Sequence, residues 1–202
     1  MRFAYPRQLP RDRRSVGFLT SERGTAGVEL SLVLPPALIL LCIVTFAGEG
    51  FELQRRASLA ARTVADLVSQ APYVQNPNVA GATGLNQSAL DTDLALSSEI
   101  MWPASTDTLR VLVSELSVKS ANNTGTVVWS EPYNGAVALP VGTIISLSPS
   151  IVATGAAYLI YGQVQYMFQP LNIEQSIGSM TLNETDILVP RNAGQITINW
   201  GQ

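Results

Sequence analysis

The side chains of this sequence that could take part in chemistry are mostly scattered carboxylates. The chain has 202 residues and no histidine, so it lacks the commonest general base and the commonest metal ligand. Serine and threonine are abundant, but no histidine or suitable lysine accompanies them as a base. Asp91 and Asp93 are two residues apart in a predicted helix and point apart. Glu131 has no carboxylate close to it in sequence.

A second carboxylate pair, Glu184 and Asp186, lies on one face of a predicted strand. It lacks the further oxygen ligands that calcium requires. The lone cysteine, Cys42, lies inside an apolar run, where a small apolar role is expected. We therefore expect a protein that is not an enzyme, with no catalytic residues, no metal site and no cofactor.

A different kind of site lies near the N-terminus. Gly24 is followed by four small or apolar residues and then by Glu29. An uncharged apolar run from Leu30 to Gly48 comes next. A carboxylate at the mouth of such a segment needs a partner, because charges are excluded from hydrocarbon. From the spacing alone, Glu29 either pairs with a positive group or lies in the headgroup zone as part of an ordinary signal anchor with its N-terminus inside.

The apolar run is long enough to cross a membrane. As a helix, Leu30–Gly48 would extend about 28 Å, close to the hydrocarbon thickness of a bilayer. Pro35 and Pro36 lie inside it and predict a kink, which membrane helices tolerate when neighbouring groups satisfy the freed carbonyls. A signal-peptidase cut after Ala47 is an alternative use of the same run.

The charges are divided unevenly about this run. Residues 1–24 carry six arginines and two acidic residues, whereas the rest of the chain is acidic. The positive-inside rule then predicts a cytoplasmic N-terminus and a C-terminal part on the other side of the membrane. The body lacks the basic face that a nucleic-acid partner would need.

The helical pattern continues beyond the apolar run. Apolar residues recur three and four apart, as a heptad-like seam of Leu53, Ala57, Ala60, Val64, Leu67 and Ala71. One helix is therefore predicted from about Thr25 to Ser69, closed by Pro72. Its second half is expected to pack on the chain's own C-terminal domain, and packing on copies or relatives is compatible with this.

The remaining elements predict an α+β fold, in which a long N-terminal transmembrane and amphipathic helix precedes an antiparallel β-sheet and a short helix. The short helix is expected over Ser88–Met101, with Leu90, Leu94 and Ile100 inward. The strand Leu109–Val118 is predicted to be half-buried and to form a hairpin with Thr126–Ser130 through the turn at 122–125. The aromatic strand Tyr158–Phe168 is placed centrally. Further strands are expected at Ile177–Val189 and Gln195–Trp200. The predicted divisions are a leader (1–24), the helix (25–71) and the sheet domain (72–202).

The order of residues from Gly24 to Glu29, followed by an apolar helix, resembles the processing site of type IV prepilins. In that family the prepilin peptidase cuts after the glycine, and glutamate is fifth in the mature chain. The corresponding cut falls between Gly24 and Thr25, and Glu29 is then the fifth residue. Leu30 stands where these proteins usually have an aromatic residue.

A wider stretch, Arg23–Ala61, is similar to the TadE/TadG-like pseudopilins of the tight-adherence (Flp) pilus system, including the Leu-Pro within the apolar run. C-terminal patterns agree in outline at Ala138–Pro140, Tyr161–Leu171 and Ile187–Arg191. The resemblance implies a pilin-like domain and a minor pseudopilin that acts in pilus biogenesis and adhesion. The resemblance implies a single-pass protein of the bacterial inner membrane. Its C-terminal domain would lie in the periplasm or in the pilus.

The implied partners are prepilin peptidase, other pilins and pseudopilins, the Tad inner-membrane assembly machinery and the lipid bilayer, with no nucleic acid. Cleavage would expose a charged amine at Thr25, which could pair with Glu29 of a neighbouring subunit and offset the cost of desolvating both charges. Two other hypotheses remain open. One is an uncleaved, membrane-anchored periplasmic scaffold of an envelope or secretion complex. The other is a secreted protein released after Ala47.

Overall fold

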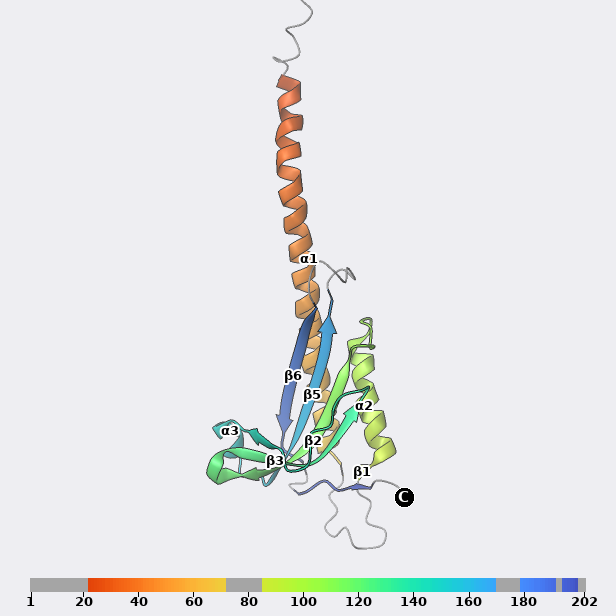
Figure 1. Ribbon diagram of the computed structural model, residues 1–202, viewed down its shortest axis with the longest axis vertical. Coiled ribbons are helices and arrows are strands. Elements are labelled where there is room, and N and C mark those ends of the chain that lie inside the picture. The colour runs from red at the N-terminus through yellow and green to blue at the C-terminus, as the bar shows by residue number, and fades with distance from the viewer. Residues whose placement is uncertain (1–21, 72–84, 170–178, 192–193, 200–202) are drawn as a thin grey trace, which may run out of the picture. The chain divides into compact units, whose positions relative to one another are not determined.

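The computed structural model describes residues 22–71, 85–169, 179–191 and 194–199, and it describes side chains from Gly27 onward (Figure 1). The chain forms two compact units, residues 1–47 and Gly48–Gln202. The described elements of the second unit are the end of helix α1, a five-stranded sheet, a two-stranded sheet and shorter helices. The expected α+β class, a long N-terminal helix followed by an antiparallel sheet and a short helix, is confirmed.

Helix α1 spans Glu22–Ser69, 48 residues, and includes Pro35 and Pro36 without interruption. It begins three residues before the predicted start at Thr25 and ends at the predicted Ser69. All described side chains from Gly27 to Thr45 are exposed. From Ala57 the pattern changes, and one face is fully buried while Leu59 and Arg62 remain exposed. The predicted change from an apolar to an amphipathic helix is therefore confirmed.

The buried face of α1 packs on its own domain. Its buried members include most of the predicted seam and extend it to neighbouring positions: Ala57, Ala60, Ala61, Val64, Ala65, Val68 and Ala71. Small side chains let the helix approach the sheet closely. A Cβ added at Gly162 would lie 2.7 Å from the Ala61 carbonyl oxygen and 3.1 Å from the Ala65 Cβ. Glycine is needed there for space rather than for backbone freedom.

The main sheet has the order β4-β3-β2-β5-β6, and all neighbouring strands are antiparallel. Its strands are β2 (Arg110–Lys119), β3 (Thr124–Tyr133), β4 (Ile144–Ser146), β5 (Tyr158–Phe168) and β6 (Met180–Leu188). The predicted hairpin is present, and Asn123 takes a positive φ of 50° in its turn. The central strand is β2 rather than β5, which lies between β2 and β6.

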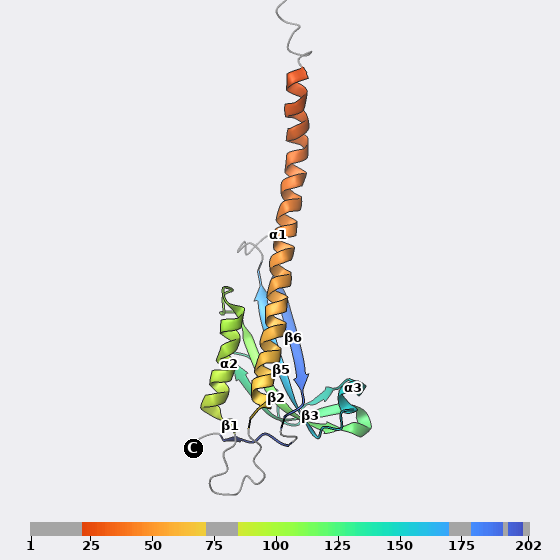
Figure 2. The ribbon, with the colours of Figure 1, turned by 180° about the vertical axis from the view of Figure 1, so that it is seen from behind.

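Helix α2 (Gln87–Met101) covers the same face of the sheet as the second half of α1 (Figure 2). Asn86 caps it by accepting a hydrogen bond from the Ser88 N–H. Leu90 and Leu94 are buried as predicted, and Ile100 is partly buried against the same core.

Strand β2 departs from its predicted half-buried pattern, because six consecutive residues from Val111 to Leu116 are buried. Val111 and Val113 face the helices. Leu116 points to the opposite face and packs in a second core with Leu159. The bulge at this point leaves Val128 of β3 without a partner in β2, so Trp129 lies in the main core and Val127 in the second. A short 3-10 helix η1 (Ser120–Asn122) follows β2, and helix α3 (Pro149–Val152) covers the second core. A central strand covered on both faces loses the alternation that one-sided burial would produce.

The C-terminal strand forms a separate pair. Strand β7 (Ile198–Asn199) runs parallel to β1 (Leu85–Asn86), and the pair forms its own two-stranded sheet. The predicted strand 195–200 therefore does not join the antiparallel sheet. Its last residue, Trp200, lies outside the described residues.

Candidate functional site

The predicted processing site lies in the first turn of α1. Gly24 and Thr25 are the third and fourth residues of the helix, and their side chains are outside the description. The Gly24–Thr25 bond therefore lies within the helical backbone of α1.

Glu29 lies just after this turn, at the start of the apolar segment. Its side chain is exposed, as are those of Val28 and Leu30 beside it. Among the residues whose side chains are described, none pairs with the Glu29 carboxylate. A Cβ added at Gly27 would meet no atom within 4 Å, so the helix surface next to Glu29 is open. The charge is thus available to a group outside the described part of the chain.

The segment that follows belongs to a helix that is, by its length and composition, long and apolar enough to cross a membrane. None of its most apolar window is buried within the part of the chain that the structure describes. Pro35 and Pro36 lack the N–H groups that would bond to the carbonyls of Ser31 and Leu32. The kink predicted at these prolines stays a prediction.

The carboxylates noted in the sequence do not form one site. Asp91 and Glu131 come close enough that the charge of Asp91, together with burial as the larger cause, raises the pKa of Glu131. Burial alone raises the pKa of Asp93. Glu184 accepts a hydrogen bond from Gln54 of α1 at 3.1 Å. Within the described residues, no group of three or more acidic, histidine or cysteine side chains could hold a metal ion.

One carboxylate that the sequence did not single out is fully buried. Glu115 of β2 has no exposed surface, and its Oε1 accepts the Ile196 N–H at 2.6 Å. Burial raises its pKa from 4.5 to about 7, although hydrogen bonds from Ile196 and Trp129 act in the opposite direction. Its Oε2 has no partner within the described part of the chain. In the sequence, Glu115 is an acidic residue at an alternating position of a predicted strand. That pattern predicts an exposed side chain on the solvent face, so it gave no sign that Glu115 is buried.

This carboxylate fixes the C-terminal segment. The Trp129 indole donates to the Ile196 carbonyl at 2.8 Å, and the Leu85 N–H donates to the Thr197 carbonyl at 3.0 Å. Ile196 itself is buried in the core beneath α1 and α2. The arrangement is that of a buried structural contact rather than of an accessible reaction centre.

A hollow of about 560 Å³ lies on the face of the sheet away from the helices. Arg110, Gln163 and Gln165 line its floor, and the apolar segment 135–140 forms its wall. The Arg110 guanidinium is already engaged, since it donates to the carbonyls of Asp107 and Leu109 at 2.8 and 3.0 Å. The hollow therefore presents amide and apolar groups rather than an activated nucleophile.

Comparison of the chain with protein-family models, with curated proteins and with solved structures finds no match.

Proposed function

We propose that this protein is a minor pseudopilin, or pilus assembly protein, of a Tad-type type IV pilus, matured by prepilin peptidase and acting in pilus biogenesis and adhesion. The observation that carries the proposal is the junction at the start of α1. Glu29 is exposed and has no partner among the described side chains. It stands five residues after Gly24 and directly before an apolar helical segment that the described part of the chain leaves unburied.

Both features of this junction require a neighbour. The apolar side chains from Leu30 onward need lipid or other helices around them, because their exposure to water is costly. Glu29 needs a positive partner in such surroundings. A new α-amine at Thr25 of an adjacent subunit would supply that partner, and pairing would offset the desolvation of both charges.

The second half of α1 is already occupied by its own domain. Its small-residue face is buried against the sheet, so it is not free to pack on other subunits. Contacts between subunits would then use the first half of α1, where Glu29 and the unburied apolar side chains lie. This division of the helix fits a subunit that presents a folded domain and recognises its neighbours within the membrane.

In this proposal the protein performs no chemistry of its own. It is a substrate of prepilin peptidase and a partner of other pilins and of the Tad inner-membrane machinery. It sits in the bacterial inner membrane with its N-terminus in the cytoplasm and unit Gly48–Gln202 in the periplasm, before any entry into the pilus. Pro35 and Pro36 would provide a kink within the bilayer.

The test is the mass of the full chain purified from membranes that contain the peptidase. We expect a mature N-terminus at Thr25. A Gly24→Val variant should retain its leader, because a β-branched residue blocks the position before the cut. The matched control is Gly27→Ala, which adds a methyl group where nothing lies within 4 Å and should be processed normally.

The second candidate is an uncleaved periplasmic scaffold anchored by α1. It is favoured by the start of the helix at Glu22, which places the Gly24–Thr25 bond inside a helix rather than in an extended segment. An intact leader on the wild-type chain in the presence of active peptidase would contradict processing and support this candidate. A soluble form that begins at Gly48 would contradict both.

A further inference from the structure

The hollow on the sheet face away from the helices has a polar floor and an apolar wall. Arg110 and Leu112 of β2 lie directly opposite Gln165 and Gln163 of β5, so the four side chains stand together on one face. The segment 135–140 forms the wall. The volume of about 560 Å³ is in the range of ligand-binding clefts.

Arg110 leaves one edge of its guanidinium group without a partner. Its Nη1 atom donates to the carbonyls of Asp107 and Leu109 at 2.8 and 3.0 Å, and these two contacts hold the group in one orientation. Among the described residues, nothing accepts a hydrogen bond from Nε or Nη2. These two nitrogens share the edge that fits both oxygens of a carboxylate. A Cβ added at Gly135 would lie 3.4 Å from Nε, so the glycine keeps the guanidinium group uncovered on this side.

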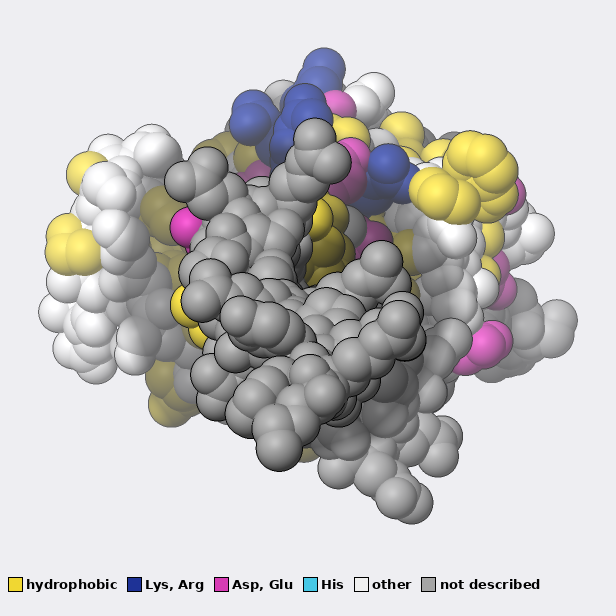
Figure 3. Space-filling model, turned by 90° about the horizontal axis from the view of Figure 1, so that it is seen from above, with side chains coloured by type: hydrophobic (Ala, Val, Ile, Leu, Met, Phe, Trp, Pro, Cys, Tyr) yellow, Lys and Arg dark blue, Asp and Glu magenta, His cyan; other side chains and the backbone are white. Residues whose placement is uncertain are grey.

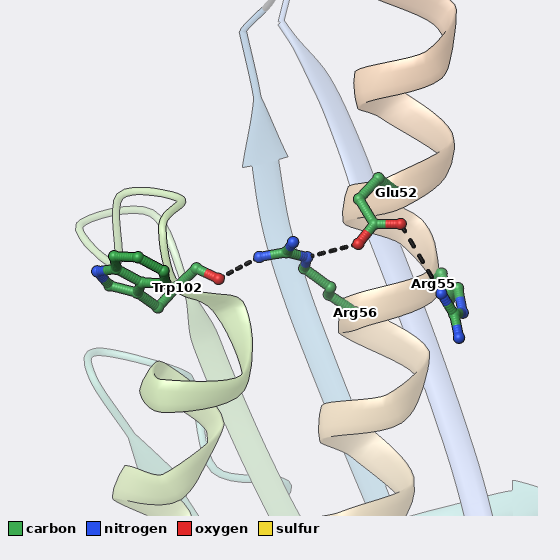
Figure 4. A network of polar contacts seen from close by, with 4 residues as sticks. All are labelled: Glu52, Arg55, Arg56 and Trp102. Atoms are coloured by element: carbon green, nitrogen blue, oxygen red, sulfur yellow. Dashed lines mark hydrogen bonds and ion pairs between the residues drawn. The ribbon is translucent and has the colours of Figure 1, made fainter.

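Other arginines of the second unit are paired within the chain. Seen from above, Lys and Arg side chains gather with acidic ones (Figure 3). Three arginines form ion pairs: Arg55 and Arg56 with Glu52 (Figure 4), and Arg191 with Asp66. Arg110 is half-buried, and within the described part of the chain no carboxylate lies at ion-pair distance from it. Its charge is therefore available to a carboxylate of another molecule.

The wall of the hollow is fixed at both ends. Asn134, just before the wall, donates to the carbonyls of Thr106 and Leu109, at 2.8 Å in each case. Near the other end, the Leu139 N–H donates to the Ser130 hydroxyl of β3 at 3.0 Å. The wall therefore stands in a set position over the sheet.

Between these two anchors, main-chain groups of the wall are free. The N–H groups of Val137 and Ala138 have no acceptor within the ranges that the structure describes. On the floor, the Gln163 amide nitrogen donates to Asn183 at 2.9 Å, which leaves the Gln163 carbonyl oxygen as an acceptor. Gln165 is exposed beside it. Donors and acceptors on both sides of a hollow suit the main chain of an extended peptide, whose polar groups all need partners.

We propose that this hollow binds an extended acidic segment of a partner protein, with a glutamate or aspartate carboxylate held by Nε and Nη2 of Arg110. The side-chain amides of Gln163 and Gln165 bind the main chain of that segment from the floor, and the free N–H groups of the wall bind it from the other side. A small carboxylate would use Arg110 alone and leave these groups unused. The inference stands apart from the proposed function, because every residue involved belongs to the second unit.

Titration of the full chain in detergent micelles with two capped peptides tests the proposal. One peptide is acetyl-Val-Ala-Glu-Ala-Val-amide, and the other has glutamine in place of the glutamate. Nuclear magnetic resonance of the arginine Nε–H groups follows the site directly, and the Arg110 signal is identified by its loss in Arg110→Lys. We expect a saturable shift of this signal with the glutamate peptide. The glutamine peptide should bind about tenfold more weakly or worse, since it lacks the charged acceptor.

Variants separate the forked contact from charge alone. Arg110→Lys should weaken binding of the glutamate peptide by about tenfold, because lysine keeps the charge but cannot hold both oxygens in one plane. The matched control is Arg62→Lys, at an exposed position of α1 outside the hollow, and it should leave the affinity unchanged. If Arg110→Lys lowers the melting temperature, the comparison of the two peptides on the wild-type chain still decides, because it needs no substitution.

The absence of a saturable shift with the glutamate peptide would overturn the proposal. Equal affinities for the glutamate and glutamine peptides would overturn it as well, and so would an unchanged affinity in Arg110→Lys. Sodium acetate is the third probe. If acetate binds as tightly as the glutamate peptide, the hollow takes a small carboxylate and the peptide proposal is wrong.

Discussion

Glu115 and Trp129 bind the two backbone polar atoms of the same residue. The Glu115 carboxylate accepts the Ile196 N–H, and the Trp129 indole donates to the Ile196 carbonyl. Glu115 lies directly opposite Trp129 in the register of β2 and β3, so two adjacent strands jointly fix a segment that follows them by more than sixty residues. This relationship makes the C-terminal segment part of the main core.

The buried Glu115 predicts a pH-dependent stability. Its pKa is about 7 in the folded protein and has its ordinary value near 4.5 in the unfolded chain. Between these values the folded state holds a proton that the unfolded state has released, so the free energy of unfolding falls as the pH rises from about 4.5 to about 7. The loss is at most about 3 kcal/mol. Urea unfolding of the full chain in micelles at pH 5, 6, 7 and 8 measures it.

Glu115→Gln should remove most of this slope, because the amide keeps an acceptor for the Ile196 N–H and carries no charge at any of these pH values. Glu99→Gln is the matched control, since Glu99 is exposed on α2 and should leave the wild-type profile unchanged. A wild-type chain equally stable at pH 5 and pH 8, or a Gln variant that keeps the slope, would contradict this role.

Trp129→Phe should loosen the C-terminal segment. The change leaves the buried Ile196 carbonyl without its donor, which costs about 1–2 kcal/mol of folding free energy. Hydrogen exchange should accelerate at the Leu85 amide, because its acceptor is the carbonyl of the adjacent Thr197. Trp102→Phe, at an exposed site, should change neither quantity. Unchanged exchange at Leu85 in the Trp129 variant would show that the indole contact does not hold the segment.

Gly162→Ala should destabilise the second unit, because its new methyl group would lie 2.7 Å from the Ala61 carbonyl oxygen. Separating α1 from β5 enough to admit it costs about 1–3 kcal/mol. The control is Gly48→Ala, where nothing lies within 4 Å, and which should be neutral or stabilising by up to about 1 kcal/mol. Denaturant unfolding measures the free energy of unfolding of both variants. Equal values for Gly162→Ala and Gly48→Ala would show that α1 can shift away from β5 without cost.

Glu29→Gln tests the assembly role of the junction. We expect normal insertion, because the apolar segment is unchanged, and a strong loss of the protein from sheared pili relative to membranes. Glu49→Gln, at the other end of the apolar run, is the matched control and should assemble normally. Wild-type amounts of the Glu29 variant in pili would refute the proposed pairing with Thr25.

The features predicted from sequence are those that depend on neighbouring residues. The apolar run after Glu29 and the spacing of Ala57, Ala60 and Val64 were sufficient to predict α1, because helix periodicity is local. The hairpin at Asn123 was equally visible from its turn residues. The position of Glu29 on the helix follows from the same local pattern, whereas Gly24 was predicted to precede the helix and lies inside it.

The features that sequence reasoning missed depend on contacts between distant residues. Glu115 contacts Ile196, 81 residues away, and nothing near Glu115 in sequence signals this burial. The bulge at Val128 of β3 places Val127 in the second core although Trp129, two residues away, lies in the first, which an alternating pattern cannot show. The two-residue pair of β1 and β7 is too short to have a pattern at all. A groove lined by Leu53 of α1, Ala104 after α2 and Phe168 of β5 arises only where these three segments meet.

The burial of α1 in the sheet domain has a mechanical consequence. Helix α1 supplies the core face Ala57–Val68 of the second unit. A pull on the chain ahead of Gly48 would act directly on the contact between Ala61 and Gly162 and would load it in shear along the helix axis. Arg191, which follows strand β6, forms an ion pair with Asp66. Its backbone N–H also donates a hydrogen bond to the Ser69 carbonyl, so two contacts tie the last turn of α1 to this segment. Tension on α1 at Gly48 would thus be carried by the core of the second unit.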